Sequence, residues 1–187
     1  MNNNIFTSPD VKQKVVFISI ITSIFLCVEI INLLSGYSLN AFGIRPRELG
    51  GLIGIFISPF LHGSVYHLIS NIFPFVILGG FIVWQGISHF IKISLTIMIA
   101  TGIMVWLFGP SLTIIVGASG VIFGYLGYLF GKAYIDRNIT DILIAVAVLF
   151  MYGGMIFGIF PGIPGVSWES HLFGFISGFG TAWLWKK

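Results

Sequence analysis

Six long apolar runs alternate with short segments that carry most of the charged and turn-forming residues. About 20 consecutive apolar residues suffice to cross the hydrocarbon core of a bilayer as a helix, so each run predicts a membrane span. The predicted spans cover residues 15–35, 66–85, 90–108, 119–135, 140–160 and 168–185. The pattern therefore predicts an all-α polytopic membrane protein built as a bundle of six transmembrane helices.

The segment between the first two spans, residues 36–63, has a different pattern. It begins with glycine, proline and arginine around residues 43–48 and continues with an apolar piece, residues 52–61, which Ser58 and Pro59 interrupt. About 10 to 14 apolar residues are too few to cross a bilayer. We expect a loop that is partly buried in the membrane interface.

The composition supports a membrane protein and excludes several other classes. The 187 residues are 57 % hydrophobic and 8 % charged, with a mean hydropathy of +1.03, whereas soluble domains carry about 25 % charged residues. The net charge of +3 is small and scattered, which excludes a nucleic-acid partner. A single cysteine, Cys27, allows neither a disulfide framework nor a cysteine metal cluster. We expect no cofactor, no metal and no obligate protein partner, and one membrane domain, residues 15–187, after a cytoplasmic tail, residues 1–14.

The charged residues also predict the orientation. With six spans and the N-terminus inside, only Arg45 and Arg47 lie outside. Seven basic residues lie inside, namely Lys12, Lys14, Lys92, Lys132, Arg137, Lys186 and Lys187. This bias satisfies the positive-inside rule and places both termini in the cytoplasm. Glu29, near the far end of the first span, is expected to have a structural role close to the interface.

Polar residues converge at the outer ends of three spans. The second, fourth and sixth spans all enter the membrane from outside, and they begin with His67 and Asn71, with Ser119 and with His171. His67 and Asn71 are four residues apart and therefore share a helix face. The topology thus predicts that four polar side chains from distant parts of the chain lie at one depth.

Glycines follow the polar residues of the fourth and sixth spans at helical spacing. Gly120 and Gly124 follow Ser119, and Gly174 and Gly178 follow His171. Stripes of small residues let membrane helices pack backbone to backbone. We therefore expect these two spans to pack closely and to bring Ser119 within hydrogen-bond reach of His171.

A serine next to a histidine can act as a nucleophile, with the histidine as its base. The hydroxyl of Ser119 becomes nucleophilic when a neutral imidazole accepts its proton. No carboxylate is well placed to orient that imidazole, because Glu169 is only two residues before it in the sequence. The pattern favours a Ser119–His171 dyad, and Asn71, His67 and the Ser119 backbone N–H are the available donors for an oxyanion.

Four segments resemble motifs of the rhomboid intramembrane serine proteases. Residues 62–71, HGSVYHLISN, resemble the family's H-x4-H-x3-N motif, and residues 117–120, GASG, resemble G-x-S-G. Residues 171–178, HLFGFISG, resemble H-x2-G-x3-G, and residues 43–47, GIRPR, are similar to a first-loop segment of bacterial members. Some members have a stacked tyrosine four residues after the serine. Phe123 here keeps the ring without the hydroxyl, which we do not expect to abolish activity.

The resemblance implies an activity and a role for each site residue. It implies that Ser119 is the nucleophile, that His171 is the general base, and that His67 and Asn71 complete the oxyanion hole. It also implies that the substrates are single-span membrane proteins cut near the outer end of their helix, in a bacterial plasma (inner) membrane. The lipid bilayer and transmembrane proteins are therefore the expected partners.

Two other functions remain as alternatives. A catalytically inactive rhomboid-like protein would bind membrane clients without cutting them, but such relatives lack the serine or the histidine. A small transporter would gather its polar groups near the bilayer midplane, whereas here they begin helices near one face. A nucleotide site at Gly131 and Lys132 is excluded, because the next residue is neither serine nor threonine.

Overall fold

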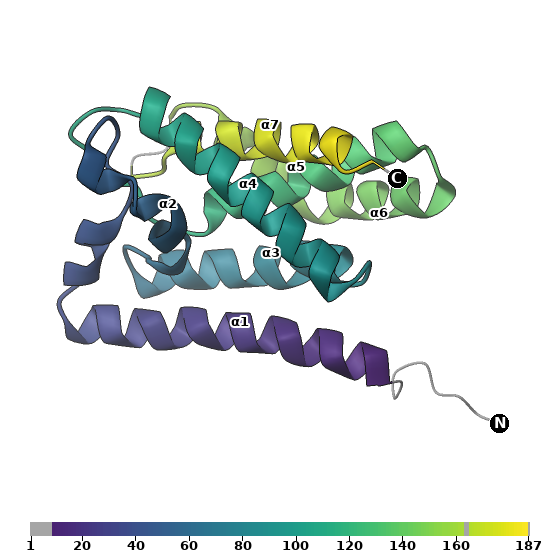
Figure 1. Cartoon of the computed structure of the whole chain (residues 1–187), viewed down its shortest axis with the longest axis horizontal. Helices are drawn as coiled ribbons and strands as arrows, with labels where there is room; N and C mark the ends of the chain where they lie inside the picture. Colours follow the sequence, from purple (N-terminus) through teal and green to yellow (C-terminus); the bar gives the residue numbers. More distant parts are fainter. Residues whose placement is uncertain (1–8, 163–164, 187) are drawn as a thin grey trace.

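In the computed structural model, which describes residues 9–162 and 165–186, five of the six long helices run along one common direction and the sixth, α4, crosses them diagonally (Figure 1). The six are α1 (Pro9–Leu34), α3 (Val65–Val83), α4 (Ile87–Phe108), α5 (Ser119–Asp136), α6 (Ile139–Tyr152) and α7 (Trp168–Leu184). In the described part of the chain, β structure is limited to one isolated bridge between Ile44 and Ile115. The predicted all-α polytopic fold is confirmed.

Two of the six helices, α5 and α7, are not long and apolar enough to count as membrane spans by themselves. By length and apolar composition, α1, α3, α4 and the segment Ile139–Ile159 can each cross a membrane. Helix α5 has 18 residues and includes Lys132 and Asp136, and α7 has 17 residues. These two lie side by side in Figure 1. Because they face other helices as well as lipid, they can carry the glycines and polar groups that a lipid-exposed helix could not.

Glycines bring α5 and α7 into backbone contact, and the four glycines predicted for helix packing lie at this contact. A Cβ built on Gly174 would lie 2.1 Å from the carbonyl oxygen of Gly120, and one on Gly178 would lie 1.8 Å from that of Gly124. A Cβ on Gly120 itself would lie 2.6 Å from Ser170 Oγ. Only glycine lets the two backbones approach this closely, so this seam fixes how the starts of α5 and α7 are placed.

Helix α1 begins earlier than the predicted first span. Pro9 and Asp10 occupy its first turn, where proline costs no hydrogen bond and an acidic side chain favours the helix dipole. Lys14 pairs with Asp10 at 2.6 Å and also donates to the Trp84 carbonyl at 3.1 Å. The predicted tail is therefore helical over residues 9–14, and residues 1–8 lie outside the described part of the chain.

The segment between α1 and α3 forms short helices, none long enough to cross a membrane. They are η2 (Ser38–Phe42), η3 (Leu49–Gly51), α2 (Gly54–Ile57) and η4 (Ser58–Phe60). Arg47 donates to the carbonyls of Leu107 and Gly109 at the end of α4, at 3.0 and 2.8 Å. Ile44 and Ile115 exchange two backbone hydrogen bonds of 2.9 Å. This first loop therefore holds residues 109–117, which lead into α5.

Lysines and tryptophans gather at the end of the bundle where α1 begins and α7 ends, on the right in Figure 1. Lys14 lies 5.5 Å from the Trp84 ring centroid, Lys92 lies 5.7 Å from that of Trp185, and Lys186 packs over Trp183. Such lysine–tryptophan pairs are typical of a membrane–water interface.

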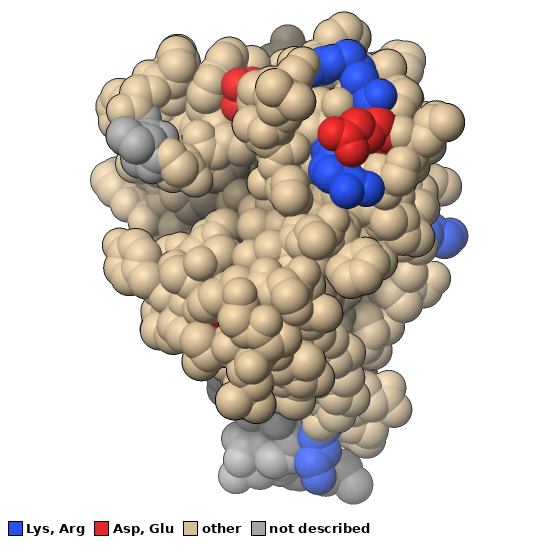
Figure 2. All heavy atoms as spheres, turned by 90° about the vertical axis from the view of Figure 1, so that its left-hand side faces the viewer, with Lys and Arg blue, Asp and Glu red and all other residues tan. Residues whose placement is uncertain are grey.

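The opposite end, which carries the first loop, faces the viewer in Figure 2. Most of this face is uncharged, and its charged side chains gather mainly in one corner. Among the first-loop residues, Arg45 and Glu48 form an ion pair of 3.2 Å. The sparse charge matches the low charged content of the whole sequence.

One expectation needs correction and another gains detail. Glu29 is 2 % exposed and shares a helix face with the buried Phe25 and Asn32, so its side chain points into the protein; its depth in the membrane stays a prediction. The predicted fifth span is α-helical only to Tyr152 and continues as the 3₁₀ helix η5 (Gly153–Ile159). Two adjacent glycines at the junction lower the α-helical propensity there.

Candidate active site

The loop before α5 places Ser119 at the end of the bundle that carries the first loop. Gly117 has φ +118, a conformation that favours glycine, and its N–H donates to the Ser58 carbonyl at 2.9 Å. A Cβ at Gly117 would lie 2.7 Å from Cε1 of His67. Glycine at this position therefore serves both the turn and the close approach of the His67 ring. Helix α5 begins at Ser119, whose backbone N–H has no acceptor within the helix.

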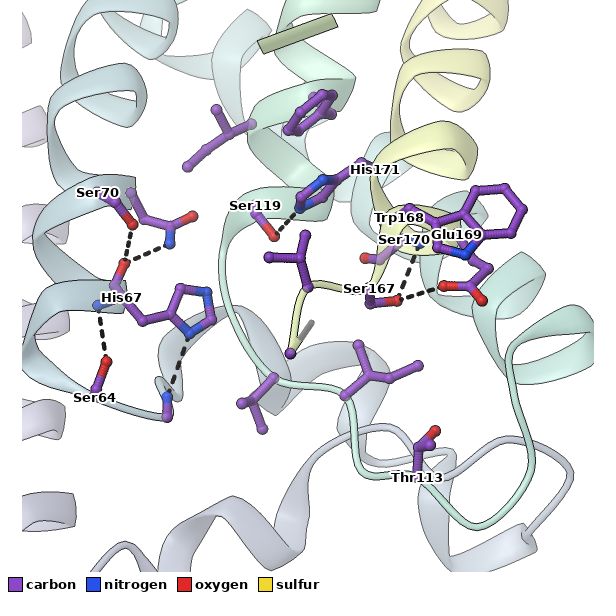
Figure 3. Close-up of a pocket in the computed structure, with 18 of the residues that line it drawn as sticks. Ser64, His67, Ser70, Thr113, Ser119, Ser167, Trp168, Glu169, Ser170 and His171 are labelled. Atoms are coloured by element: carbon purple, nitrogen blue, oxygen red, sulfur yellow. Dashed lines mark hydrogen bonds between the residues drawn. The ribbon is translucent and has the colours of Figure 1, made fainter. Parts of the chain in front are cut away.

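Ser119 and His171 are brought together by the α5–α7 seam. His171 lies in the first turn of α7, is 8 % exposed, and places its Nε2 2.9 Å from Ser119 Oγ. Figure 3 shows this contact, with Ser119 lying between His171 and His67. The distance is that of a hydrogen bond between a hydroxyl and an imidazole.

A backbone carbonyl fixes the protonation of the His171 ring. Nδ1 of His171 lies 3.0 Å from the carbonyl oxygen of Gly158, in η5. A carbonyl oxygen can only accept, so Nδ1 carries the proton. In the neutral ring, Nε2 is then the acceptor for the Ser119 hydroxyl, which is the arrangement that a general base needs.

The ring of Phe123 supports His171 from the side. The two ring centroids are 4.1 Å apart, and the planes differ by 7°. Phe123 is one turn after Ser119 on α5, so a single helix positions both the hydroxyl and the aromatic surface beneath the imidazole. The stacking sets the plane of the imidazole but does not distinguish its two nitrogens.

Glu169 is not the hydrogen-bond partner of the His171 ring. Its carboxylate accepts a hydrogen bond from the Ser167 hydroxyl at 3.3 Å, and Nδ1 of His171 is occupied by the Gly158 carbonyl. Sequence reasoning missed Gly158, because a backbone acceptor leaves no side-chain signature. Nothing in the pattern of residues 153–159 could have identified it.

His67 and Asn71, from the first turns of α3, line the same cavity as Ser119. The Gly63 N–H lies 3.4 Å from His67 Nδ1, so Nδ1 accepts and the neutral ring carries its proton on Nε2. Asn71 donates one amide hydrogen to the His67 carbonyl at 2.7 Å and keeps a second hydrogen for another acceptor. Both side chains can therefore donate toward an oxygen beside Ser119.

His62, the first residue of the H-x4-H-x3-N motif, lies behind His67. It is fully buried, and the two rings contact edge to face with centroids 5.1 Å apart. Burial lowers the pKa of His62 to about 3, and the neighbouring His67 adds to the effect. His62 is therefore neutral. Its carbonyl accepts from Asn32 and Asn40, both at 3.2 Å, which ties α1 and η2 to the start of α3.

The cavity around these groups has a volume of about 930 Å³. Its wall combines apolar side chains with hydroxyls, including those of Ser64, Ser70 and Ser167 (Figure 3). In the described part of the chain, no group of three or more His, Cys, Asp or Glu residues is placed to hold a metal ion. The cavity is large enough for several residues of an extended peptide, and its reactive groups are a hydroxyl, two imidazoles and an amide.

Comparison with known proteins identifies a matching family model and several relatives. The Rhomboid domain model matches residues 49–187. An uncharacterized protein of Mycobacterium tuberculosis is 39 % identical over 165 residues, which cover 84 % of this chain and 69 % of the relative. An uncharacterized protein of Mycobacterium leprae is 40 % identical over 167 residues, 84 % of this chain and 65 % of its own.

A plant relative is more distant. RHOMBOID-like protein 4 of Arabidopsis thaliana is 33 % identical over 125 residues, which cover 64 % of this chain and 30 % of the plant protein. The family match extends over most of the chain and includes every residue of the cavity described above. The protein is an integral membrane protein that belongs to the rhomboid family.

Proposed function

We propose that the protein is an intramembrane serine endopeptidase that cuts transmembrane segments by a Ser119–His171 dyad. The observation that carries the proposal is the 2.9 Å contact between Ser119 Oγ and His171 Nε2 on the wall of a large cavity. The Nδ1 contact with Gly158 supports it, because it leaves Nε2 free to accept the hydroxyl proton. Membership of the rhomboid family supports the same reaction class.

In the acylation step, Ser119 Oγ attacks the carbonyl carbon of the scissile bond while its proton moves to His171 Nε2. The carbonyl oxygen becomes an oxyanion. The proposed donors are the Nε2–H of His67, the second amide hydrogen of Asn71 and the backbone N–H of Ser119. When the tetrahedral intermediate collapses, the C–N bond breaks and His171 returns its proton to the leaving amine.

Water completes the reaction. His171, neutral again, accepts a proton from a water molecule that attacks the acyl ester on Ser119. Collapse of the second tetrahedral intermediate releases the carboxyl product and returns the proton to Ser119 Oγ. The polar wall of the cavity, with its serine hydroxyls, can hold this water within the membrane boundary.

The proposed site of cleavage is the extracytoplasmic face of a bacterial plasma membrane, with both termini in the cytoplasm. The lysine–tryptophan pairs at the end opposite the cavity support this orientation. The proposed substrates are transmembrane proteins whose helix unwinds near that face. A peptide bond in an intact helix is shielded by neighbouring turns, so segments with glycine, proline or other weak helix formers are favoured.

Purified protein reconstituted with a single-span reporter tests the proposal. We expect two fragments, and mass spectrometry should place the cut in the outer part of the reporter helix. A serine-directed fluorophosphonate should label the protein on the peptide that contains Ser119. A reporter that binds but stays intact would instead favour a client-binding protein without protease activity.

A further inference from the structure

The contact between Gly158 and His171 joins the catalytic base to the most weakly packed part of the bundle. Only 6 % of the apolar window in Ile139–Ile159 is buried, against 33 % for α3 and α4. Helix α6 buries Asp141 and Val148, and none of the residues of η5 is buried. The element that holds the His171 tautomer therefore shares little buried surface with the rest of the protein.

The two ends of α6 are anchored unequally. At the inner end, Asp141 pairs with Lys132 of α5, and the Asn138 side chain caps the helix by accepting from the Asp141 N–H. At the outer end, Met155 and Ile156 make apolar contacts with the core. Among the described residues, the hydrogen bond from His171 is the one polar contact that joins η5 to another helix. The outer end can therefore move while the inner end stays in place.

From this geometry we infer that the Gly158 carbonyl is a positioning group of the catalytic site, which holds the proton of His171 on Nδ1. The inference rests on the proposed protease function. Seated η5 holds the proton on Nδ1 of His171 and leaves Nε2 as the acceptor. If η5 moves outward by about 1 Å, the contact exceeds hydrogen-bond distance. The ring can then place its proton on Nε2, and that tautomer cannot accept the proton of Ser119.

Stacking on Phe123 cannot by itself hold the proton of His171 on Nδ1. A stacked ring can turn over in its plane, or exchange its tautomer, without losing the 4.1 Å contact between the centroids.

Alanine at the two glycines of η5 gives a matched pair of variants. A Cβ on Gly158 would lie 3.0 Å from Phe123 Cζ and 3.2 Å from His171 Nδ1, whereas a Cβ on Gly154 would meet nothing within 4 Å. Gly158→Ala should lower kcat about 10- to 100-fold, as a shift of about 1 Å in a catalytic group does. KM should change less than about twofold, since the rest of the cavity wall is untouched. Gly154→Ala should match wild type in both constants.

Nitrogen-15 NMR of the histidine rings provides the readout that packing alone would not change. In the wild type, His171 should show a protonated Nδ1 and an unprotonated Nε2. In Gly158→Ala, the spectrum should show a mixture of tautomers, while the spectrum of Gly154→Ala should match that of the wild type. An unchanged His171 tautomer in a slow Gly158→Ala variant would overturn the inference, because the loss would then come from displacement alone.

An ester bond between residues 158 and 159 keeps every side chain and serves if Gly158→Ala does not fold. Replacing Ile159 by its α-hydroxy analogue turns the Gly158 carbonyl into a weaker acceptor, and kcat should fall about three- to tenfold. An ester variant with the wild-type kcat would overturn the inference. The proposed function would still stand in that case if the wild type cleaves the reporter and Ser119→Ala does not. Failure of the function would instead appear as no cleavage by the wild type.

Discussion

Gly178→Ala tests how tightly the dyad depends on the seam between α5 and α7. The added Cβ would lie 1.8 Å from the Gly124 carbonyl oxygen and 2.8 Å from the Tyr128 backbone nitrogen. Both are backbone atoms, so no change of rotamer relieves the overlap. To restore ordinary contact the helices must separate by about 1.6 Å near this point.

The expected effects follow from that displacement. Overpacking costs about 1 to 3 kcal/mol, and alanine in a helix offsets about 0.5 to 1 kcal/mol of it, so the middle of the two ranges gives a net loss of about 1 kcal/mol for Gly178→Ala. Gly178 is two turns beyond His171 on the same helix, so part of the shift reaches the base. A misplacement approaching 1 Å should lower kcat about 10- to 100-fold.

Gly180→Ala is the matched control, because a Cβ there meets nothing within 4 Å. It makes the same chemical change in the same helix, and it should keep wild-type activity with equal or slightly higher stability. Thermal unfolding in detergent and cleavage of the reporter measure both properties. Equal melting temperatures and equal kcat values for Gly178→Ala and Gly180→Ala would refute the seam as the support of the dyad.

Three further predictions address the oxyanion donors, the Phe123 ring stacked on His171, and the ion pair between Lys132 and Asp141. Asn71→Ala and His67→Ala should each lower kcat about 10- to 1,000-fold without preventing fluorophosphonate labelling, and unchanged kcat in both would assign the oxyanion to other donors. Phe123→Leu should lower kcat about tenfold while unfolding within about 1 kcal/mol of wild type, since it loses the stacked surface but little volume; full activity would show that stacking is dispensable. Lys132→Met should destabilise the protein by about 1 to 2 kcal/mol with little change in kcat, because it leaves Asp141 without its cation far from the cavity; an unaltered melting temperature would show that the pair contributes nothing to stability.

The features that could be predicted from the sequence are those that depend on the length of apolar runs or on the spacing of particular residues along the chain. Long apolar runs define helices because a bilayer demands about 20 such residues, and the spacing of Gly120 and Gly124 places them on one helix face. The order of the spans then places Ser119 and His171 at the same end of the bundle. Their side chains are indeed in contact, at 2.9 Å.

Other features depend on contacts between distant backbone atoms. The bridge between Ile44 and Ile115 and the bond from Gly117 to Ser58 position the serine loop, yet neither leaves a mark on residue type. The contact between the Gly158 carbonyl and His171 is of the same kind. A carboxylate partner for the base could have been sought in the sequence, whereas a carbonyl acceptor is present at every residue.

Depth along a helix proved easier to predict than direction around it. Glu29 was placed near the end of the first span, but its orientation required knowledge of which face of α1 meets α3 and the first loop. In the structure that face carries Phe25 and Asn32, and it buries Glu29 with them. Helix α1 lacks a clear apolar face, because apolar residues occur all around it and lipid and protein favour the same side chains.

The most direct test of the proposed dyad compares turnover of the reconstituted reporter by wild type, Ser119→Ala and His171→Ala. The proposed mechanism predicts that both variants stay folded in the membrane and lose cleavage, because neither the hydroxyl nor the imidazole can act alone. It also predicts that wild type cuts the reporter once, within its helix. Cleavage at the wild-type rate by either variant would contradict the Ser119–His171 mechanism.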